Sequence, residues 1–256
     1  MSGQDSSTQA LVRVTNLNKR YGDLTALSGV SFSIRRGEVL GLIGPNGSGK
    51  TTLFECLAGV LPADGGTVVD VMEPDRPLAP NRRSAMLFYL PDAIAPWPAQ
   101  PVRWAFDFTI GFFGGDAGAR DEVVRRFDLE PILDTAIGSL SKGQRKRALL
   151  AMSLLTPQPI LLADEPFDGL DLRQTREAAA ALRTHASAGR TLLLSIHQIA
   201  DAARICDRFV LLSGGRVCGE GTLPELSALA AARGAAGAGP GSPGGDNLEE
   251  VFLALT

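Results

Sequence analysis

The chain carries Gly44-Pro45-Asn46-Gly47-Ser48-Gly49-Lys50-Thr51, a segment that matches the phosphate-loop pattern GxxxxGK followed by Ser or Thr. An apolar run at residues 38–43 precedes it, and residues 50–58 are expected to form a helix. This order of strand, glycine-rich loop and helix is typical of a nucleotide-binding unit. The glycines let backbone N–H groups converge on phosphate oxygens. Lys50 then supplies a cation to the β- and γ-phosphates, and Thr51 offers its hydroxyl to Mg²⁺.

Further short apolar runs mark the other strands of the core. Most of them neighbour helical stretches, which predicts a parallel sheet covered by helices on both faces. Residues 11–36 instead alternate between apolar and polar side chains, the period of a half-buried antiparallel strand. We therefore predict an α/β fold: a P-loop core with a parallel sheet, an N-terminal antiparallel β subdomain and an inserted helical subdomain. The runs are residues 85–90, 159–163, 191–196 and 209–212.

The helical subdomain is expected at about residues 93–157. From Pro91 onward, four prolines and a cluster of aromatic residues come first, and helical patterns follow at residues 121–127 and 141–155. Near the C-terminus, a stretch of Gly, Ala, Pro and Ser is too poor in large apolar side chains to form a core and is expected to be a linker. The predicted division is a polar tail (1–10), a nucleotide-binding domain (11–232), the linker (233–245) and a C-terminal helix (246–256).

The composition narrows the class of protein. The 256 residues include 25 basic and 28 acidic ones, so no overall basic field is available to hold a nucleic acid, and we expect no nucleic-acid partner. The apolar runs fall far short of the roughly 20 residues that span a bilayer. Residues 1–10 lack the features of a secretion signal, which favours a cytoplasmic protein. The cysteines Cys56, Cys206 and Cys218 fit reduced, packed thiols.

A pair of carboxylates follows one of the predicted strands. Asp164 and Glu165 come directly after Ile160-Leu161-Leu162-Ala163. The first carboxylate can hold hydrated Mg²⁺, and the second can orient the attacking water in phosphoryl transfer. Acidic residues are common where a loop begins, so this pair indicates phosphoryl transfer only when it is considered together with the phosphate loop.

The segment Leu140-Ser141-Lys142-Gly143-Gln144 precedes a predicted helix, and at these residues the chain resembles an ATP-binding cassette (ABC) ATPase, whose signature normally reads LSGGQ. The resemblance covers about residues 11–225 and implies ATP and Mg²⁺ as cofactors. It implies that the Ser141 hydroxyl and the Gly143 amide point at a γ-phosphate, with Lys142 and Gln144 beside them. An ordinary helix N-cap is the alternative interpretation of Ser141.

The resemblance assigns further residues by position. Tyr21 matches the aromatic residue that stacks on adenine, and His197 matches the histidine that contacts the γ-phosphate; an ordinary strand tyrosine and a structural histidine are the alternatives. The segment Gly169-Leu170-Asp171 resembles the loop through which two cassettes sense each other, with a plain surface turn as the alternative. Thr52, after the phosphate loop, is included among the nucleotide contacts.

Two positions depart from the family pattern. Asp92 stands where a glutamine is usual; aspartate offers an oxygen to Mg²⁺ but is shorter and cannot donate a hydrogen bond. Lys142 replaces the first signature glycine, and its ammonium either approaches a partner's phosphates or points to solvent.

The resemblance also implies partners. Each ATP lies between the phosphate loop of one cassette and the signature of another, so a single copy of each motif implies that two cassettes meet. We expect a homodimer that closes on two Mg-ATP, with a pair of different cassettes as the alternative. Glu165 would polarise water, and His197 and Lys50 would stabilise charge on the phosphate. The chain looks most like the ATP subunit of a bacterial export system, which implies a separate transmembrane permease and a place at the inner face of the cell membrane.

Other functions remain open from the sequence. An import subunit is one. A non-transport cassette is another: a membrane-associated mechanical regulator, a soluble ATPase acting on ribosomes or DNA, or a cassette that binds ATP and only gates assembly. An aromatic cluster lies in the helical region, and most of it is expected to form the subdomain core, with the remainder lining a groove for a permease helix. Its members are Trp97, Trp104, Phe106, Phe108, Phe112 and Phe113.

Overall fold

The computed structural model describes residues 9–235 and 247–256. Its centre is a six-stranded sheet in the order β5-β6-β7-β3-β8-β9, in which only β9 runs antiparallel to its neighbour. The predicted α/β fold with a parallel sheet is confirmed. The strands are β3 (Val39–Ile43), β5 (Leu87–Leu90), β6 (Ile160–Asp164), β7 (Thr191–Ile196), β8 (Arg208–Ser213) and β9 (Arg216–Gly221).

Helices on one face of the central sheet, and a helix with the N-terminal sheet on the other, bury its central strands completely. Every residue of β3, β6 and β7 is buried, because strands covered on both sides can be apolar throughout. Within β3, Val39 and Ile43 belong to the apolar cluster formed with α6 and α7, whereas Leu40 and Leu42 belong to the cluster formed with α1 and the N-terminal sheet. The helices of these layers are α1 (Lys50–Ala58), α2 (Pro80–Met86), α6 (Leu172–Ser187) and α7 (Ile199–Ile205).

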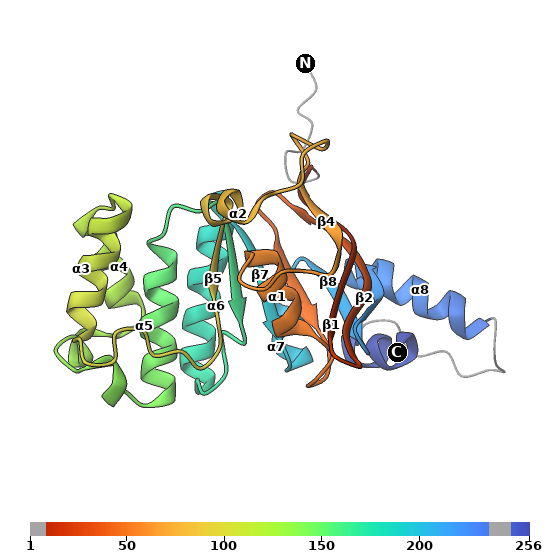
Figure 1. Cartoon of the computed structure of the whole chain (residues 1–256). Helices are drawn as coiled ribbons and strands as arrows, with labels where there is room; N and C mark the ends of the chain where they lie inside the picture. The colour runs from red at the N-terminus through yellow and green to blue at the C-terminus, as the bar shows by residue number, and fades with distance from the viewer. Residues whose placement is uncertain (1–8, 236–246) are drawn as a thin grey trace, which may run out of the picture.

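The predicted N-terminal antiparallel sheet is confirmed. It has the order β2-β1-β4, made of β1 (Ala10–Tyr21), β2 (Leu24–Arg35) and β4 (Gly65–Asp70). Figure 1 shows it at the side of the molecule opposite the helical insertion. The apolar run expected as a strand at residues 85–90 begins two residues later, at Leu87, because Ala85 and Met86 complete the last turn of α2.

A group of helices separates β5 from β6 along the chain and lies to one side of the sheet (Figure 1). It comprises α3 (Val102–Phe113), α4 (Ala117–Arg126), the short 3-10 turns η2 (Glu130–Ile132) and η3 (Ile137–Ser139), and α5 (Lys142–Leu154). The expectation for its aromatic residues was wrong. Phe106 is fully buried and Phe113 is half-buried, but the other four are exposed: Trp97, Trp104, Phe108 and Phe112.

The C-terminal helix packs on its own chain. α8 (Leu223–Ala235) and α9 (Leu248–Leu255) contact each other, and α9 also contacts α7. Asn247 caps α9 by accepting a hydrogen bond from the N–H of Glu249, and Leu248, Val251 and Leu255 are buried. α8 extends to Ala235, past the expected start of the linker at residue 233. The rest of that linker and Asp246 lie outside the described residues, as do residues 1–8 of the N-terminal tail.

Across residues 9–235 and 247–256, no helix is both long enough and apolar enough to cross a bilayer.

A buried ion triad joins the central sheet to β2. Arg208 of β8 donates to Glu38 at 3.0 Å and to Glu220 of β9 at 2.7 Å, and Glu220 also accepts a hydrogen bond from the Ser33 hydroxyl. The side chains of Arg208 and Glu38 are only 6% and 7% exposed. Burial raises the pKa of Glu38, and the Arg208 guanidinium opposes that effect.

Replacing Arg208 by Ala is expected to lower the free energy of unfolding by about 3–5 kcal/mol, because a buried carboxylate loses its cation. Urea denaturation measures the change. Arg173 is the matched control, since its pair with Asp128 is exposed at both ends (72% and 58%). Arg173→Ala should shift the free energy of unfolding by less than about 1 kcal/mol. Equal shifts for the two variants would contradict a structural role for the triad.

Candidate functional site

The phosphate loop connects the end of β3 to the start of α1. Gly49, the residue before α1, has a φ of 105°, and a Cβ there would lie 2.6 Å from the carbonyl oxygen of Ala26, so only glycine fits. The Lys50 ammonium donates to the carbonyl oxygens of Gly44 at 2.8 Å and Pro45 at 3.2 Å. Burial lowers the pKa of Lys50, while the carboxylates of Glu165 and Asp164 raise it.

The loop contains a buried polar atom that the folded chain leaves without a partner. The Ser48 hydroxyl is buried and makes no hydrogen bond within the described residues. An unpaired buried hydroxyl is costly, and it lies between the glycines whose N–H groups are expected to hold phosphate. This pattern fits a loop that completes its hydrogen bonds with an anion.

Asp164, at the end of β6, lies next to Thr51. The Thr51 hydroxyl donates to the Asp164 carboxylate at 2.7 Å, and the Ser195 hydroxyl of β7 donates to the second oxygen of the same carboxylate. The Asp164 side chain is buried. Carboxylate and hydroxyl oxygens are the ligands that Mg²⁺ prefers, so the pair of Thr51 and Asp164 fits such a cation.

Glu165 follows Asp164 with a φ of 46°, in the left-handed region that few non-glycine residues adopt. Its backbone N–H donates to the Ser195 hydroxyl at 2.8 Å, which holds the turn. His197 follows β7 on the adjacent strand, and its Nδ1 lies 3.7 Å from Glu165 Oε2. The two side chains therefore share one partly open space.

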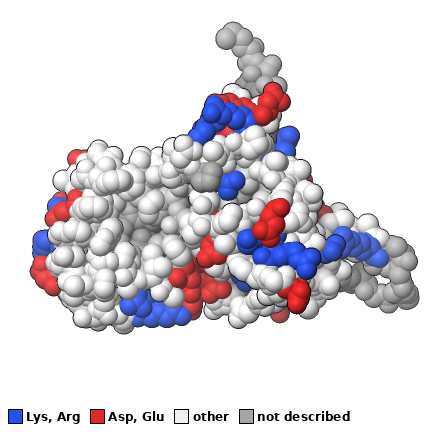
Figure 2. Space-filling view, in the orientation of Figure 1, with Lys and Arg blue, Asp and Glu red and all other residues white. Residues whose placement is uncertain are grey.

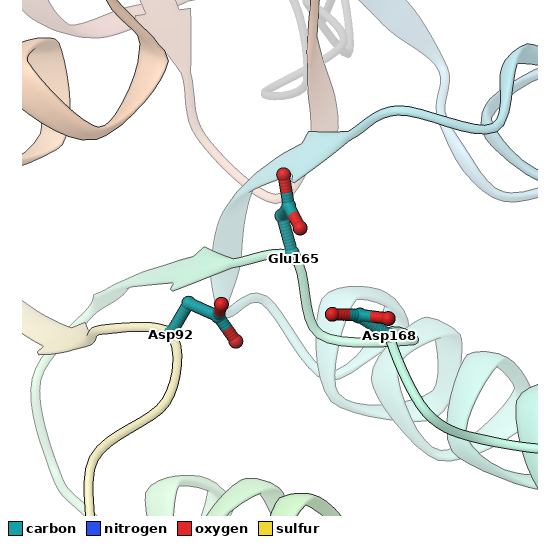
Figure 3. A group of neighbouring side chains, drawn as sticks. All are labelled: Asp92, Glu165 and Asp168. Atoms are coloured by element: carbon teal, nitrogen blue, oxygen red, sulfur yellow. The ribbon is translucent and has the colours of Figure 1, made fainter. Parts of the chain in front are cut away.

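Asp92 lies on the loop after β5 and is already paired. Its carboxylate accepts a hydrogen bond at 2.5 Å from the ammonium of Lys146 on α5, a side chain that is only 6% exposed. Carboxylate oxygens of Asp92, Glu165 and Asp168 all lie within 4.8 Å of one another. Figure 3 shows Asp92 reaching in from one loop, and Glu165 and Asp168 from the loop after β6. In this arrangement the position at which the family usually has glutamine contributes an ion pair.

The signature segment forms the beginning of α5. Ser141 is the N-cap: its hydroxyl accepts the N–H of Gln144 at 3.2 Å, and the Gln144 side chain accepts the N–H of Ser141 at 3.0 Å. The Ser141 O–H proton is not used in this cap, so capping and donation to a phosphate are compatible. A Cβ at Gly143 would lie 2.6 Å from the carbonyl oxygen of Gly169, which explains the glycine.

The Lys142 ammonium pairs with Asp168 at 2.5 Å. Asp168 belongs to the loop between β6 and α6, and Asp171 at its end caps α6 by accepting the N–H of Gln174 at 2.8 Å. The signature turn and this loop of the same chain are therefore in direct contact.

Tyr21 ends β1 with 45% of its surface exposed. The ammonium of Lys19 lies 5.6 Å from the centre of its ring. An exposed ring at the end of a strand is available for stacking, so the expected contact with adenine stays a prediction.

The structure gathers Lys50, Thr51, Asp164, Glu165 and His197 at the carboxyl ends of the neighbouring strands β6, β7 and β3. The carboxyl edge of a parallel sheet is where such folds bind ligands. Phosphoryl transfer requires a cation, a hydroxyl and a carboxylate that can hold a metal ion, and a base. These groups lie together at this edge.

Sequence reasoning missed three residues that shape this site. Ser195 holds both Asp164 and Glu165. As a polar residue between the apolar residues Leu194 and Ile196 it carried a signal. Lys146 and Asp168 gave none, because the residue with which each of them pairs is distant along the chain.

The family described as ABC transporter matches residues 27–168 of this chain. That span is more than half of the sequence, so the chain belongs to the ABC transporter family. It is an ATP-binding subunit of that family, and hydrolysis of ATP is its activity.

Relatives and solved structures agree with this assignment. Nod factor export ATP-binding protein I of Burkholderia orbicola is 35% identical over 80% of this chain and 69% of that protein. Daunorubicin resistance ATP-binding protein DrrA3 of Streptomyces coeruleorubidus is 35% identical over 85% of this chain and 70% of that protein. The solved structure of an ATP binding subunit of an ABC transporter matches with a TM-score of 0.81 and 27% identity, covering 96% of this chain and 99% of that one.

Proposed function

We propose that this chain hydrolyses ATP to drive an export system whose permease is a separate membrane protein. The observation that carries the proposal is the convergence of Lys50, Thr51, Asp164, Glu165 and His197 at one sheet edge. The direction of transport is supported by relatives whose names include Nod factor export and daunorubicin resistance. The protein would then work at the cytoplasmic face of the cell membrane.

The proposed roles follow from the position of each group. The loop from Gly44 to Thr51 binds the phosphates. The Lys50 ammonium gives up its hydrogen bonds to the carbonyl oxygens of Gly44 and Pro45 and contacts the phosphates instead. Glu165 accepts the proton of the attacking water, and His197 stabilises charge on the phosphate. Tyr21 stacks on the adenine.

Thr51 and Asp164 are the proposed Mg²⁺ ligands, since their oxygens already lie 2.7 Å apart. When bound, the cation would offset charge on the phosphates. Asp92 stays a predicted third ligand, but it would first have to leave Lys146. Mg²⁺ supplied to the protein is therefore expected to bind chiefly through the first two residues.

The active form is proposed to be a homodimer. Ser141 and Gly143 lie at the N-terminus of α5, and Gly143 approaches the carbonyl oxygen of Gly169 in the loop after β6 of its own chain. A helix N-terminus with an available hydroxyl proton is suited to a phosphate, and the phosphate in question would be the γ-phosphate held by a second copy. Two copies then close on two ATP molecules.

The proposed permease contact is the apolar groove beside α3. Its volume is about 170 Å³, and its lining includes Trp97, Phe108, Phe113 and Met152. Trp104, Phe108 and Phe112 form a stacked row along α3 with centroid separations of 5.2 and 6.0 Å. Figure 2 shows that the helical side of the molecule carries few charged residues on the face turned to the viewer. Such a surface suits an amphipathic helix of a partner.

Affinity capture from detergent-solubilised native membranes with Mg-ATP tests the proposal. A polytopic membrane protein without its own ATPase domain should be captured. If only ribosomal proteins or other soluble partners are captured, a non-transport cassette replaces the proposal while the ATPase assignment stands.

Phe108→Ala is expected to reduce the captured membrane protein by about tenfold, because central aromatic residues dominate helix-in-groove contacts. The matched control is Leu253→Ala, which removes another exposed apolar side chain (70% exposed) from α9. Quantitative mass spectrometry compares the two. Equal losses would show that α3 is not the contact.

A further inference from the structure

Lys142 occupies a position that is unfavourable for a cation. It is the first residue of α5, and the N-terminus of a helix carries partial positive charge. The first turn contains no acidic residue, and Arg145 and Lys146 follow. A cation at the N-terminus of a helix is expected to have a compensating contact elsewhere in the structure.

The compensating contact is the ion pair with Asp168. The hydrogen bond from Lys142 lowers the pKa of Asp168, and the same bond raises the pKa of Lys142. The aliphatic stem of Lys142 also covers Gly169: a Cβ built there would lie 3.2 Å from its Cγ and Cδ. Beside it, Gly143 approaches the Gly169 carbonyl too closely to carry a side chain. The first turn of α5 thus touches the loop at two adjacent points.

The loop transmits this contact to Glu165. The backbone N–H of Asp168 donates to the carbonyl oxygen of Glu165 at 3.1 Å, and their carboxylates lie within 4.8 Å of each other. Figure 3 shows the two side chains on the same short loop. The position of the Lys142 ammonium is therefore tied, through Asp168, to the turn that carries the proposed base.

We propose that Lys142 is a positioning residue, whose ion pair with Asp168 fixes the signature turn of α5 relative to Glu165. The inference rests on the proposed function, in which the signature turn acts on the ATP of the partner copy and Glu165 acts on the ATP of its own chain. The pair then links the two ATP sites of the dimer within each chain.

The pair should matter little for folding. Lys142 is 54% exposed and Asp168 is 28% exposed, and ion pairs this open to water contribute little to stability. A small misplacement of catalytic groups, in contrast, costs much in rate. Loss of turnover without loss of thermal stability therefore separates positioning from a structural role.

The test compares five forms of the full chain with the wild type: Lys142→Ala, Lys142→Arg, Lys142→Asp, Asp168→Lys and the double exchange Lys142→Asp/Asp168→Lys. Steady-state ATP hydrolysis gives kcat, KM and the Hill coefficient, and thermal melts give Tm. Lys142→Ala should lower kcat by about tenfold and bring the Hill coefficient towards one, with Tm changed by only about 2 °C. Lys142→Arg should retain turnover, and the double exchange should recover most of the activity lost in Lys142→Asp and in Asp168→Lys.

The matched control is the exposed pair of Arg103 and Asp134 on the helical insertion, whose side chains are 53% and 83% exposed. Arg103→Asp should leave kcat unchanged. Equal kcat and Hill coefficients for wild type and Lys142→Ala, or no recovery in the double exchange, would overturn the inference. Glu165→Gln is measured alongside: if it lowers hydrolysis while the Lys142 variants do not, only this inference fails. If it has no effect, the proposed function fails as well.

Discussion

Glu165→Gln is expected to lower kcat for ATP hydrolysis by about 10²–10⁴-fold, the usual contribution of a general base. Glutamine has nearly the same shape but does not accept a proton at neutral pH. The backbone hydrogen bond from residue 165 to Ser195 is kept, so the turn should not change. ATP binding should persist, because the phosphate loop is untouched. Phosphate release and equilibrium ATP binding measure the two effects separately.

Glu177→Gln is the matched control for this prediction. Glu177 lies on α6 in an exposed pair with Arg173 at 3.2 Å, so its loss should change kcat by less than about twofold. Hydrolysis at the wild-type rate in Glu165→Gln would remove Glu165 from the proposed role of base.

Lys50→Ala is expected to weaken ATP binding itself. A hydrogen bond to a charged group contributes about 1.5–3 kcal/mol, so Kd should rise by about 10- to 100-fold. The ammonium is buried within the loop and bonded to the carbonyl oxygens of Gly44 and Pro45, and far-ultraviolet circular dichroism checks that the variant folds. Calorimetric titration with Mg-ATP gives Kd.

The two variants are expected to fail at different steps of the ATPase cycle. Glu165→Gln should bind ATP and fail to hydrolyse it, whereas Lys50→Ala should fail at binding. Loss of binding in both, or of hydrolysis alone in both, would contradict the division of roles between the loop and the strand end.

The core of the site could be predicted because its motifs are local in sequence. The phosphate loop contains its own glycines, lysine and threonine, and a buried strand ending at Asp164 places the next residue at the edge of a parallel sheet. His197 was assigned through the family resemblance, and the parallel sheet places it at the same edge as Lys50 and Asp164.

The ion pairs around the site could not be predicted in the same way. Asp92 and Lys146 are separated by two helices of the insertion, and Lys142 and Asp168 by the whole of α5 and β6. Which charge meets which depends on how α5 lies against the two loops, and no sequence period reports that. Asp92 in particular was predicted as a metal ligand from its position in the family pattern and its carboxylate oxygen, and its pairing with Lys146 was not foreseen.

The prediction that most of the aromatic residues are buried failed for a different reason. Large aromatic side chains are usually buried, and Phe106 of α3 is buried as this tendency predicts. Trp104, Phe108 and Phe112 recur at every fourth residue, so they share one face of the helix. Helical spacing predicts a common face but does not tell whether that face is turned to the core or to a partner.

Light scattering on Glu165→Gln with and without Mg-ATP tests most directly the claim that two chains complete each ATP site. With hydrolysis blocked, the mass in the presence of Mg-ATP should be that of two chains, and addition of Lys50→Ala to the same chain should return it to one. A single chain that is saturated with ATP would contradict the claim.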